Sequence, residues 1–277
     1  MTDILIALAI VGSIGLLAGI ILAVASHLFH VKEDEKKLKL RECLPGINCG
    51  ACGYKGCDDY AEAMANGTAK PNLCIPGAAD VSHGLAEILG VEAEQPKQLV
   101  AFVHCNGNCE ATTKKAVYDG VQTCKAAAMV YGGPDACSYG CMGYGDCAAA
   151  CPSNAICIKD GIAHVDASFC VGCGLCTTVC PKKIITLIPQ ETVAAVMCSS
   201  HDKGADAKKA CQSACIGCKK CEKVCPTKAI QVNNNLATID YDQCIKCRVC
   251  VEECPTHCLK TVVFPEVKIK ITEDDLE

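Results

Sequence analysis

Tryptophan is absent from this chain of 277 residues, which also has only 4 phenylalanines and 7 tyrosines. So few large aromatic side chains cannot fill conventional hydrophobic cores in a chain of this length, so another group must help to hold the folded parts together. Positive charge is not in excess, because the net charge is −5 at pH 7, which argues against a nucleic-acid-binding protein. Neither a glycine-rich dinucleotide fingerprint nor a P-loop occurs, so the sequence predicts no catalytic residue of its own.

Cysteine, in contrast, is abundant, with 28 residues. Disulfide frameworks belong mostly to small secreted domains, and this chain is too long for that class. Its cysteines also fall in Cys-x2-Cys clusters, which favours thiolate-bound metal in a compartment that keeps thiols reduced. Candidate metals are iron, in iron–sulfur clusters, and zinc.

The amino-terminal stretch 4–25 contains no charged residue and no proline. As a helix it would be about 33 Å long, enough to cross a hydrocarbon core of roughly 30 Å. A cleaved signal peptide is the alternative, but the leader has no Lys or Arg and the apolar run is too long for one. Basic residues follow the stretch, so the positive-inside rule predicts a single-pass membrane protein with the bulk of its chain in the cytoplasm.

An internal repeat is the most informative feature of the sequence. When the chain is shifted by 74 residues, seven cysteines and two prolines of one copy coincide with those of the other. Within each copy, apolar residues flank a turn rich in Asp, Asn and Gly, which predicts a β-hairpin. Apolar strands are expected after the last cysteines, at 184–188 and 259–264. The pairs are Cys141 and Cys215, Cys147 and Cys221, Cys151 and Cys225, Cys170 and Cys244, Cys173 and Cys247, Cys176 and Cys250, and Cys180 and Cys254; Cys124 and Cys137 likewise fall on Cys198 and Cys211.

The second copy has the spacing of bacterial two-cluster ferredoxins, in which each run of four cysteines ends in Cys-Pro. There, three cysteines of one run bind one [4Fe–4S] cluster and the fourth binds the other cluster. Zinc sites use two Cys-x2-Cys pairs and need neither a third cysteine nor the Cys-Pro endings, so clusters are favoured. The predicted ligands are Cys215, Cys218, Cys221 and Cys254 for one cluster, and Cys244, Cys247, Cys250 and Cys225 for the other.

The first copy departs from this pattern, because Tyr144 occupies the position that matches Cys218. We expect Cys137 to supply the missing ligand, and a three-iron cluster is the alternative. The predicted ligands are Cys170, Cys173, Cys176 and Cys151 for one cluster, and Cys137, Cys141, Cys147 and Cys180 for the other.

A separate set of four cysteines precedes the repeat, and a predicted helix at 58–66, which ends at Gly67, lies between the third and the fourth of them. Glycines between these cysteines let the backbone close around a metal centre. A fifth [4Fe–4S] cluster is the first interpretation, and zinc is the second. The set is Cys49, Cys52, Cys57 and Cys74.

Of the remaining cysteines, two are predicted to be packing residues on strands, Cys157 and Cys258. Four others allow two interpretations, a sixth cluster site or buried free thiols. They are Cys105, Cys124, Cys198 and Cys211. The sequence therefore predicts five [4Fe–4S] clusters and leaves a sixth open.

The segment 44–57 (LPGINCGACGYKGC), the Cys74-Ile-Pro-Gly motif and the ferredoxin-like tail ending in Cys254-Pro-Thr-His-Cys258 resemble the B subunit of the Rnf complex, in the longer form with two ferredoxin-like modules. The resemblance implies an electron-transfer subunit of an Na⁺- or H⁺-translocating ferredoxin:NAD oxidoreductase in the bacterial plasma (inner) membrane. Its expected partners are soluble ferredoxin, the lipid bilayer, and the membrane and flavin/NAD subunits. Alternatives are a relay subunit of a soluble hydrogenase or dehydrogenase, a zinc scaffold, or an Rsx-type complex that reduces a redox-sensing transcription factor.

The predicted fold class is α+β, and the predicted domains follow the cysteine clusters. They are a transmembrane anchor (1–29), a small helical 4Fe–4S domain (30–92), a connecting segment (93–134), a first ferredoxin-like module (135–190), a connector (191–212), a second module (213–265) and an acidic tail (266–277).

Overall fold

The computed structural model describes residues 12–13, 15–20, 22, 24, 35–92 and 98–265. Most of the predicted span 4–25 and all of the acidic tail lie outside these residues. Within the described part of the chain, no helix has both the length and the apolar character that crossing a bilayer requires.

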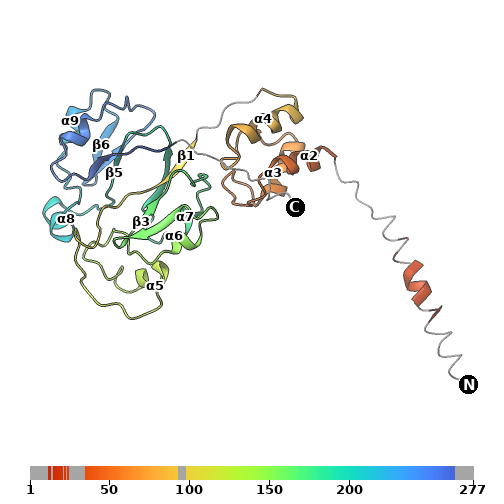
Figure 1. The fold of residues 1–277 in the computed structure, drawn as a ribbon, viewed down its shortest axis with the longest axis horizontal. Coiled ribbons are helices and arrows are strands. Elements are labelled where there is room, and N and C mark those ends of the chain that lie inside the picture. Colours follow the sequence, from red (N-terminus) through yellow and green to blue (C-terminus); the bar gives the residue numbers. More distant parts are fainter. Residues whose placement is uncertain are drawn as a thin grey trace, which may run out of the picture.

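The small amino-terminal domain consists of three helices, of which α2 (Glu35–Cys43) packs against both α3 (Cys57–Ala65) and α4 (Ala78–Leu89) (Figure 1). The helix predicted at 58–66 is α3, which begins one residue earlier. Gly67 follows its C-cap in the left-handed region (φ +72°), as expected for a helix-ending glycine. The core of this domain is formed by Leu40, Leu44, Tyr60, Ala61, Met64, Cys74 and Leu85.

The first ferredoxin-like module contains the predicted hairpin, formed by β2 (Ile156–Lys159) and β3 (Ile162–Val165). Asp160 and Gly161 at the turn both have positive φ, the geometry of a tight hairpin turn. The strand expected at 184–188 is β4 (Ile185–Pro189). It pairs with β1 (Leu99–Val103), from the segment predicted to be a connector.

The second module repeats this arrangement. Its hairpin is β6 (Ile230–Asn233) with β7 (Leu236–Ile239), and both turn residues again have positive φ. The strand β8 (Leu259–Thr261) is shorter than the stretch predicted at 259–264, and it pairs with β5 (Ala194–Val196) from the second connector. Short helices complete the two modules: α5 (Cys124–Met129), α6 (Asp146–Ala149), α7 (Leu175–Val179), α8 (Gly204–Ala210), α9 (Lys220–Val224) and α10 (Val249–Glu252).

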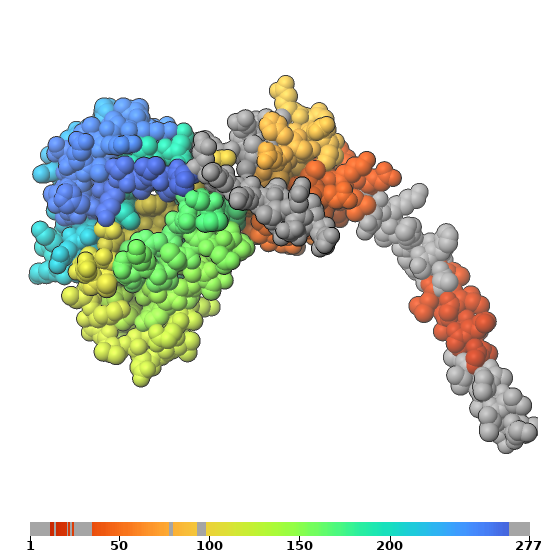
Figure 2. Space-filling view, viewed as in Figure 1, coloured from red at the N-terminus to blue at the C-terminus, as the bar shows by residue number. Residues whose placement is uncertain are grey.

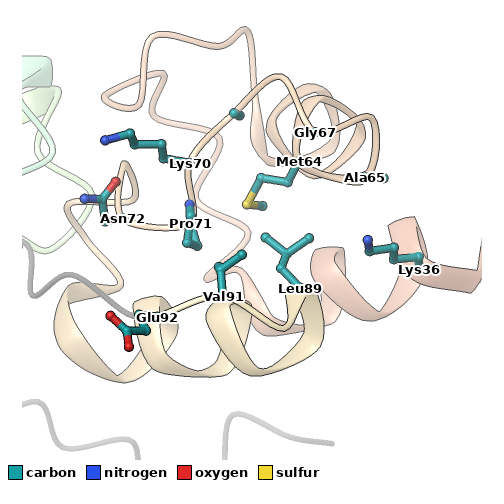
Figure 3. Close-up of a pocket in the computed structure, with 11 residues that line it drawn as sticks. Lys36, Met64, Ala65, Gly67, Lys70, Pro71, Asn72, Leu89, Val91 and Glu92 are labelled. Carbon is teal, nitrogen blue, oxygen red and sulfur yellow. The ribbon is translucent and has the colours of Figure 1, made fainter.

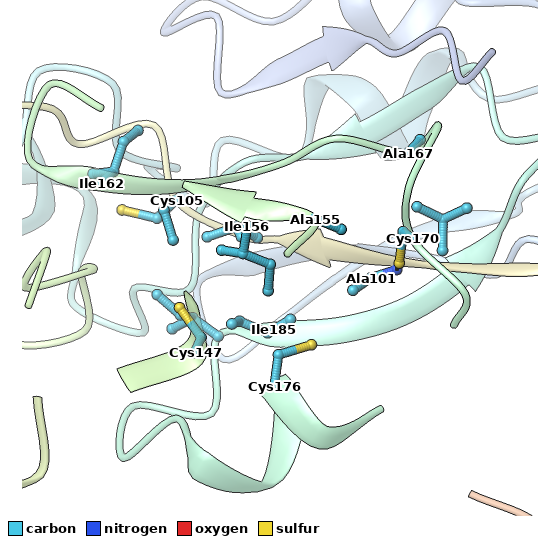
Figure 4. Packing of buried hydrophobic residues seen from close by; sticks show 14 residues of the cluster. Ala101, Cys105, Cys147, Ala155, Ile156, Ile162, Ala167, Cys170, Cys176 and Ile185 are labelled. Carbon is cyan, nitrogen blue, oxygen red and sulfur yellow. Dashed lines mark hydrogen bonds between the residues drawn. The ribbon is translucent and has the colours of Figure 1, made fainter. Parts of the chain in front are cut away.

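The cores of the modules are built from small aliphatic residues and cysteines rather than aromatics. In Figure 4, Ile156 and Ile185 lie between Cys147 on one side and Cys170 and Cys176 on the other, and all five side chains are buried. The space-filling view shows the two modules in contact, with the second (blue) beside the first (green) (Figure 2). The mixed helix and strand content agrees with the predicted α+β class.

Candidate metal centres

Four loops of the two modules share one backbone conformation. In each loop, the residue before and the residue after the middle position have positive φ, as Gly217 and Lys219 do around Cys218. Such left-handed positions turn successive backbone N–H groups inward and form a concave nest that suits an anionic group such as a cluster. The loop around Tyr144 has the same conformation although its middle residue is not a cysteine. The flanking residues of the other three loops are Gly172 and Gly174, Lys246 and Arg248, and Gly143 and Gly145.

One cavity of the second module is lined by four cysteines that were predicted to bind one cluster. Its water-accessible volume is about 10 Å³. Cys254 comes from the other half of the module, after α10, so the crossing ligand lies where the ferredoxin pattern predicts it. The four cysteines are Cys215, Cys218, Cys221 and Cys254.

Cys258 lines the same cavity, a position that sequence reasoning missed. It is buried, as expected of a packing residue, but its Sγ also lies 3.6 Å from Cys254 Sγ. Hydrogen bonds from the Cys258 thiol lower the pKa of Cys254 and of Cys215, whereas the pKa of Cys258 is strongly raised. The Cys258 thiol is therefore a close neighbour of two sulfurs of the site. Its match to Ile184 in the other copy gave no sign of this role.

The other half of the second module gathers a further set of thiols. Burial raises the pKa of Cys250 to about 11, and the neighbouring thiols raise it as well. Three are on the loop around Cys247, and the fourth, Cys225, follows α9 and crosses to them. The neighbours of Cys250 are Cys225, Cys244 and Cys247.

In the first module, the corresponding set is partly buried beneath β1. The N–H of Ala101 donates to Cys170 Sγ (3.4 Å), and the N–H of Ala155 donates to Cys151 Sγ (3.3 Å). Burial raises the pKa of Cys176 to about 12, and the neighbouring thiols of Cys170, Cys173 and Cys151 act in the same direction. All four predicted thiols of this cluster therefore lie together.

The other predicted cluster site of the first module is a cavity whose lining differs from the prediction. Cys141, Cys147 and Cys180 line it as expected, but the fourth cysteine is Cys124 and not Cys137. Burial raises the pKa of Cys147 to about 12, and its neighbouring thiols are those of Cys141, Cys124 and Cys180. The water-accessible volume of the cavity is about 20 Å³.

Cys137 lines a third cavity, between the two modules. Three of its other lining residues are cysteines for which the sequence left two interpretations open. The water-accessible volume of this cavity is about 20 Å³. The three are Cys105, Cys198 and Cys211.

The amino-terminal set of thiols is held by α3 and the loops around it. Burial raises the pKa of Cys74 to about 11, and its neighbouring thiols are Cys57, Cys49 and Cys52. Tyr60 on α3 fixes the loop before Cys74, because its hydroxyl donates to Lys70 O (2.6 Å) and accepts from the Leu73 N–H (3.2 Å). The predicted four thiols are thus on one side of this domain.

A further hollow is lined by no cysteine. It lies next to α3 and α4 and has a water-accessible volume of about 390 Å³, and Figure 3 shows Met64, Leu89 and Val91 pointing into it, with Lys36 and Lys70 at its margin. No thiol, histidine or other metal-binding constellation lines it. Across residues 35–92 and 98–265, no three His, Cys, Asp or Glu side chains lie close enough together to hold a single metal ion.

The donor groups at the cysteine sites fit [4Fe–4S] clusters. Each site gathers thiols on short loops with left-handed positions, and several sulfurs accept backbone N–H hydrogen bonds, as cluster-bound thiolates commonly do. The crossing of Cys225 and Cys254 between the halves of the second module also follows the two-cluster pattern.

Three family models match the chain at these sites. Residues 44–76 match an Fe-S cluster family, residues 163–186 match the 4Fe-4S binding domain, and residues 207–255 match the 4Fe-4S dicluster domain. The matches cover the amino-terminal set of cysteines and part of each module, so iron–sulfur domains and a ferredoxin-like fold are established for this chain.

Curated relatives extend over most of the chain. The B subunit of the Na(+)-translocating ferredoxin:NAD(+) oxidoreductase complex of Acetobacterium woodii is 44% identical over 241 residues, which are 87% of this chain and 72% of that protein. The B subunit of the proton-translocating ferredoxin:NAD(+) oxidoreductase complex of Clostridium ljungdahlii is 41% identical, over 87% of this chain and 85% of that protein. The B subunit of the ion-translocating oxidoreductase complex of Methanosarcina acetivorans is 37% identical, over 88% and 93%. The chain therefore belongs to the family of iron–sulfur B subunits of ion-translocating ferredoxin:NAD oxidoreductase (Rnf) complexes.

Proposed function

We propose that the chain carries single electrons from reduced ferredoxin through a series of iron–sulfur clusters to membrane partners in an ion-translocating oxidoreductase complex. The observation that supports this most directly is the cavity of the second module, where four thiols from both halves of a ferredoxin-like fold face one space. The names of the relatives in Acetobacterium woodii and Clostridium ljungdahlii supply ferredoxin as donor and NAD⁺ as acceptor.

Five sites are assigned to [4Fe–4S] clusters, which when bound take up and release one electron at a time. The protein residues hold the sulfurs in place, exclude water and direct N–H groups at them. Four of the ligand sets are Cys49, Cys52, Cys57 and Cys74; Cys151, Cys170, Cys173 and Cys176; Cys215, Cys218, Cys221 and Cys254; and Cys225, Cys244, Cys247 and Cys250. The fifth set includes Cys141, Cys147 and Cys180.

The amino-terminal site adjoins the first module. Cys49 is close enough to Cys173 to raise the pKa of that thiol. In addition, a side chain at Gly172 would come within 3.1 Å of Ile75 Cγ2, next to Cys74. These contacts support electron transfer between the amino-terminal cluster and the first module, because short gaps favour electron transfer.

Membrane attachment is part of this proposal. The stretch 4–25 would anchor the chain, with the cysteine-rich domains on the cytoplasmic side, where the basic residues after the stretch belong. Its described side chains Leu16, Leu17 and Leu22 are between 62% and 70% exposed, which leaves them available to lipid or to partner helices.

The function is tested with the full chain purified without oxygen. We expect about four irons and four sulfides per site. We also expect reduced ferredoxin to reduce the clusters, which electron paramagnetic resonance would detect. Zinc in place of iron, or iron that ferredoxin cannot reduce, would refute the proposal and favour the zinc-scaffold alternative.

A basic surface beside the second module is the expected docking site for ferredoxin. Lys219 and Lys220 are exposed next to Cys218, which is itself exposed, whereas Lys246 forms an ion pair with Glu191 (2.6 Å). Replacing both Lys219 and Lys220 by glutamate should slow ferredoxin-driven reduction about tenfold at low salt and flatten its salt dependence, because acidic partners are steered by such charges.

The matched control carries the same charge change on α8, at Lys208 and Lys209, which are also exposed. This control should reduce at the wild-type rate. Equal rates in both variants at low salt would show that ferredoxin docks elsewhere.

A further inference from the structure

The cavity between the two modules is built from equivalent parts of each. The N–H of His104, after β1, donates to Ile184 O (2.8 Å), and the N–H of Met197, after β5, donates to Cys258 O (2.7 Å). Ile184 and Cys258 occupy matching positions of the two copies, so His104 corresponds to Met197. The next residues, Cys105 and Cys198, are therefore structural counterparts.

This correspondence differs from the one that the sequence shift indicates. A shift of 74 residues aligns Cys198 with Cys124, but the first copy has a longer connection after its strand cysteine, residues 106–136 against residues 199–210. Cys124 belongs to that longer connection. Cys105 and Cys198 thus correspond in the three-dimensional structure but not in the sequence shift. Cys137 and Cys211 correspond in both, because they lie four residues before Cys141 and Cys215, respectively.

Backbone N–H groups are directed at the strand cysteines in the same manner in both modules. Cys105 Sγ accepts from Gly107 N and Cys141 N, both at 3.4 Å. Cys198 Sγ accepts from Ser200 N (3.4 Å) and Cys215 N (3.2 Å). Two backbone N–H donors at each sulfur are an arrangement that cluster-bound thiolates commonly have.

The space between the four sulfurs is kept open by glycines. A side chain at Gly107 would lie 3.2 Å from Cys211 Sγ and 3.6 Å from Cys105 Sγ. One at Gly140 would lie 3.6 Å from Cys137 Sγ and 3.8 Å from Cys105 Sγ. The water-accessible volume of the cavity is about 20 Å³, equal to that of the cysteine-lined cavity of the first module and above the 10 Å³ of the one in the second module.

Hydrogen bonds join the two modules around this cavity. His104 Nδ1 is hydrogen-bonded to Val196 O (2.7 Å), and Ser199 Oγ donates to His104 O (2.9 Å). On the other side, Thr112 Oγ1 donates to Ala210 O (2.8 Å). These hydrogen bonds hold the segments of the two modules that carry the four thiols next to each other.

The longer connection also brings Cys124 to the site that Tyr144 leaves incomplete. The Asp146 carboxylate accepts hydrogen bonds from Cys124 N and Lys125 N, both at 2.9 Å, and holds the start of α5 beside Cys147. Tyr144 turns instead towards Tyr118, with ring centroids 5.8 Å apart.

We propose that a sixth [4Fe–4S] cluster lies between the two modules, bound by Cys105, Cys137, Cys198 and Cys211. In the same arrangement Cys124 is the fourth ligand of the site formed by Cys141, Cys147 and Cys180. This inference rests on the proposed cluster-based function. Cys141 and Cys215 each hold a module cluster with Sγ and donate N–H to the sixth site, so the sixth site joins the two modules into one continuous series.

The test uses the full chain, purified without oxygen, and counts iron. The wild-type chain should hold about 24 irons, four per cluster, and C198A/C211A about 20. In that background, adding Cys137→Ala should change neither the iron content nor the spectra, because its site is already dismantled. Adding Cys124→Ala should instead produce the resonance signal of a three-iron cluster or remove about four more irons.

Two further variants serve as an independent test of the same site and as a negative control. C105A/C137A removes the two ligands of the same cluster that come from the first module and should give the same spectra as C198A/C211A. If one of the two variants folds poorly, the other still tests the site. C109A/C157A removes two exposed thiols outside the cavities and should keep all the iron.

The proposal is overturned if the wild-type chain holds only about 20 irons, or if adding Cys137→Ala costs iron and adding Cys124→Ala does not. A wild-type chain without iron would refute the proposed function itself, so the two failures are distinguishable.

Discussion

Removal of iron is expected to unfold both ferredoxin-like modules. Of the ten buried residues in the core of the second module, four are cysteines and none is aromatic. In such a module, cluster binding supplies most of the free energy of folding, so its loss should abolish a stability of about 5–15 kcal/mol. Hydrogen exchange would show this as loss of protection at the β6 and β7 amides after anaerobic chelation.

Reconstitution provides the control for this experiment. Iron and sulfide added under reducing conditions should restore protection at the same amides. Modules whose amides remain protected without iron would show that the aliphatic core is sufficient for folding. The clusters would then contribute little to the stability of the modules.

Replacing Gly172 by alanine should have the second large effect. Gly172 has φ +67°, and a Cβ there would overlap the carbonyl oxygen of Leu99 on β1. The strain of the left-handed backbone and this overlap together should cost about 3 kcal/mol in the free energy of unfolding. Because Gly172 precedes Cys173, the first-module site should also lose iron.

Gly174→Ala is the matched control, because it separates the overlap from the backbone strain. Its φ is +77°, but a Cβ there would make only an ordinary contact, 3.6 Å from Leu187 Cδ1. We expect a loss of about 1 kcal/mol and unchanged iron content. Anaerobic guanidinium unfolding measures both variants, and equal losses would show that β1 moves aside at little cost.

Local features were predictable because short stretches of chain determine them. The turns at Asp160 and Asn234 have the polar residues that tolerate positive φ, so both hairpins are where the sequence predicted them. Spacing within each cysteine loop is likewise set by two intervening residues. Pairing of β1 with β4 was not predicted, because these strands are separated by about 80 residues and neither has a distinctive partner signal.

Residue spacing alone was enough to show which cysteines share a loop, since the distance between ligands of one loop depends only on a few covalent links. Tertiary structure decided how the isolated cysteines Cys105, Cys124, Cys137 and Cys198 are distributed among the sites. Their neighbours come from distant strands and from a connection whose length differs between the two copies, so a linear shift aligns residues that the fold separates. Only the register of β1 and β5 against β4 and β8 reveals the correspondence.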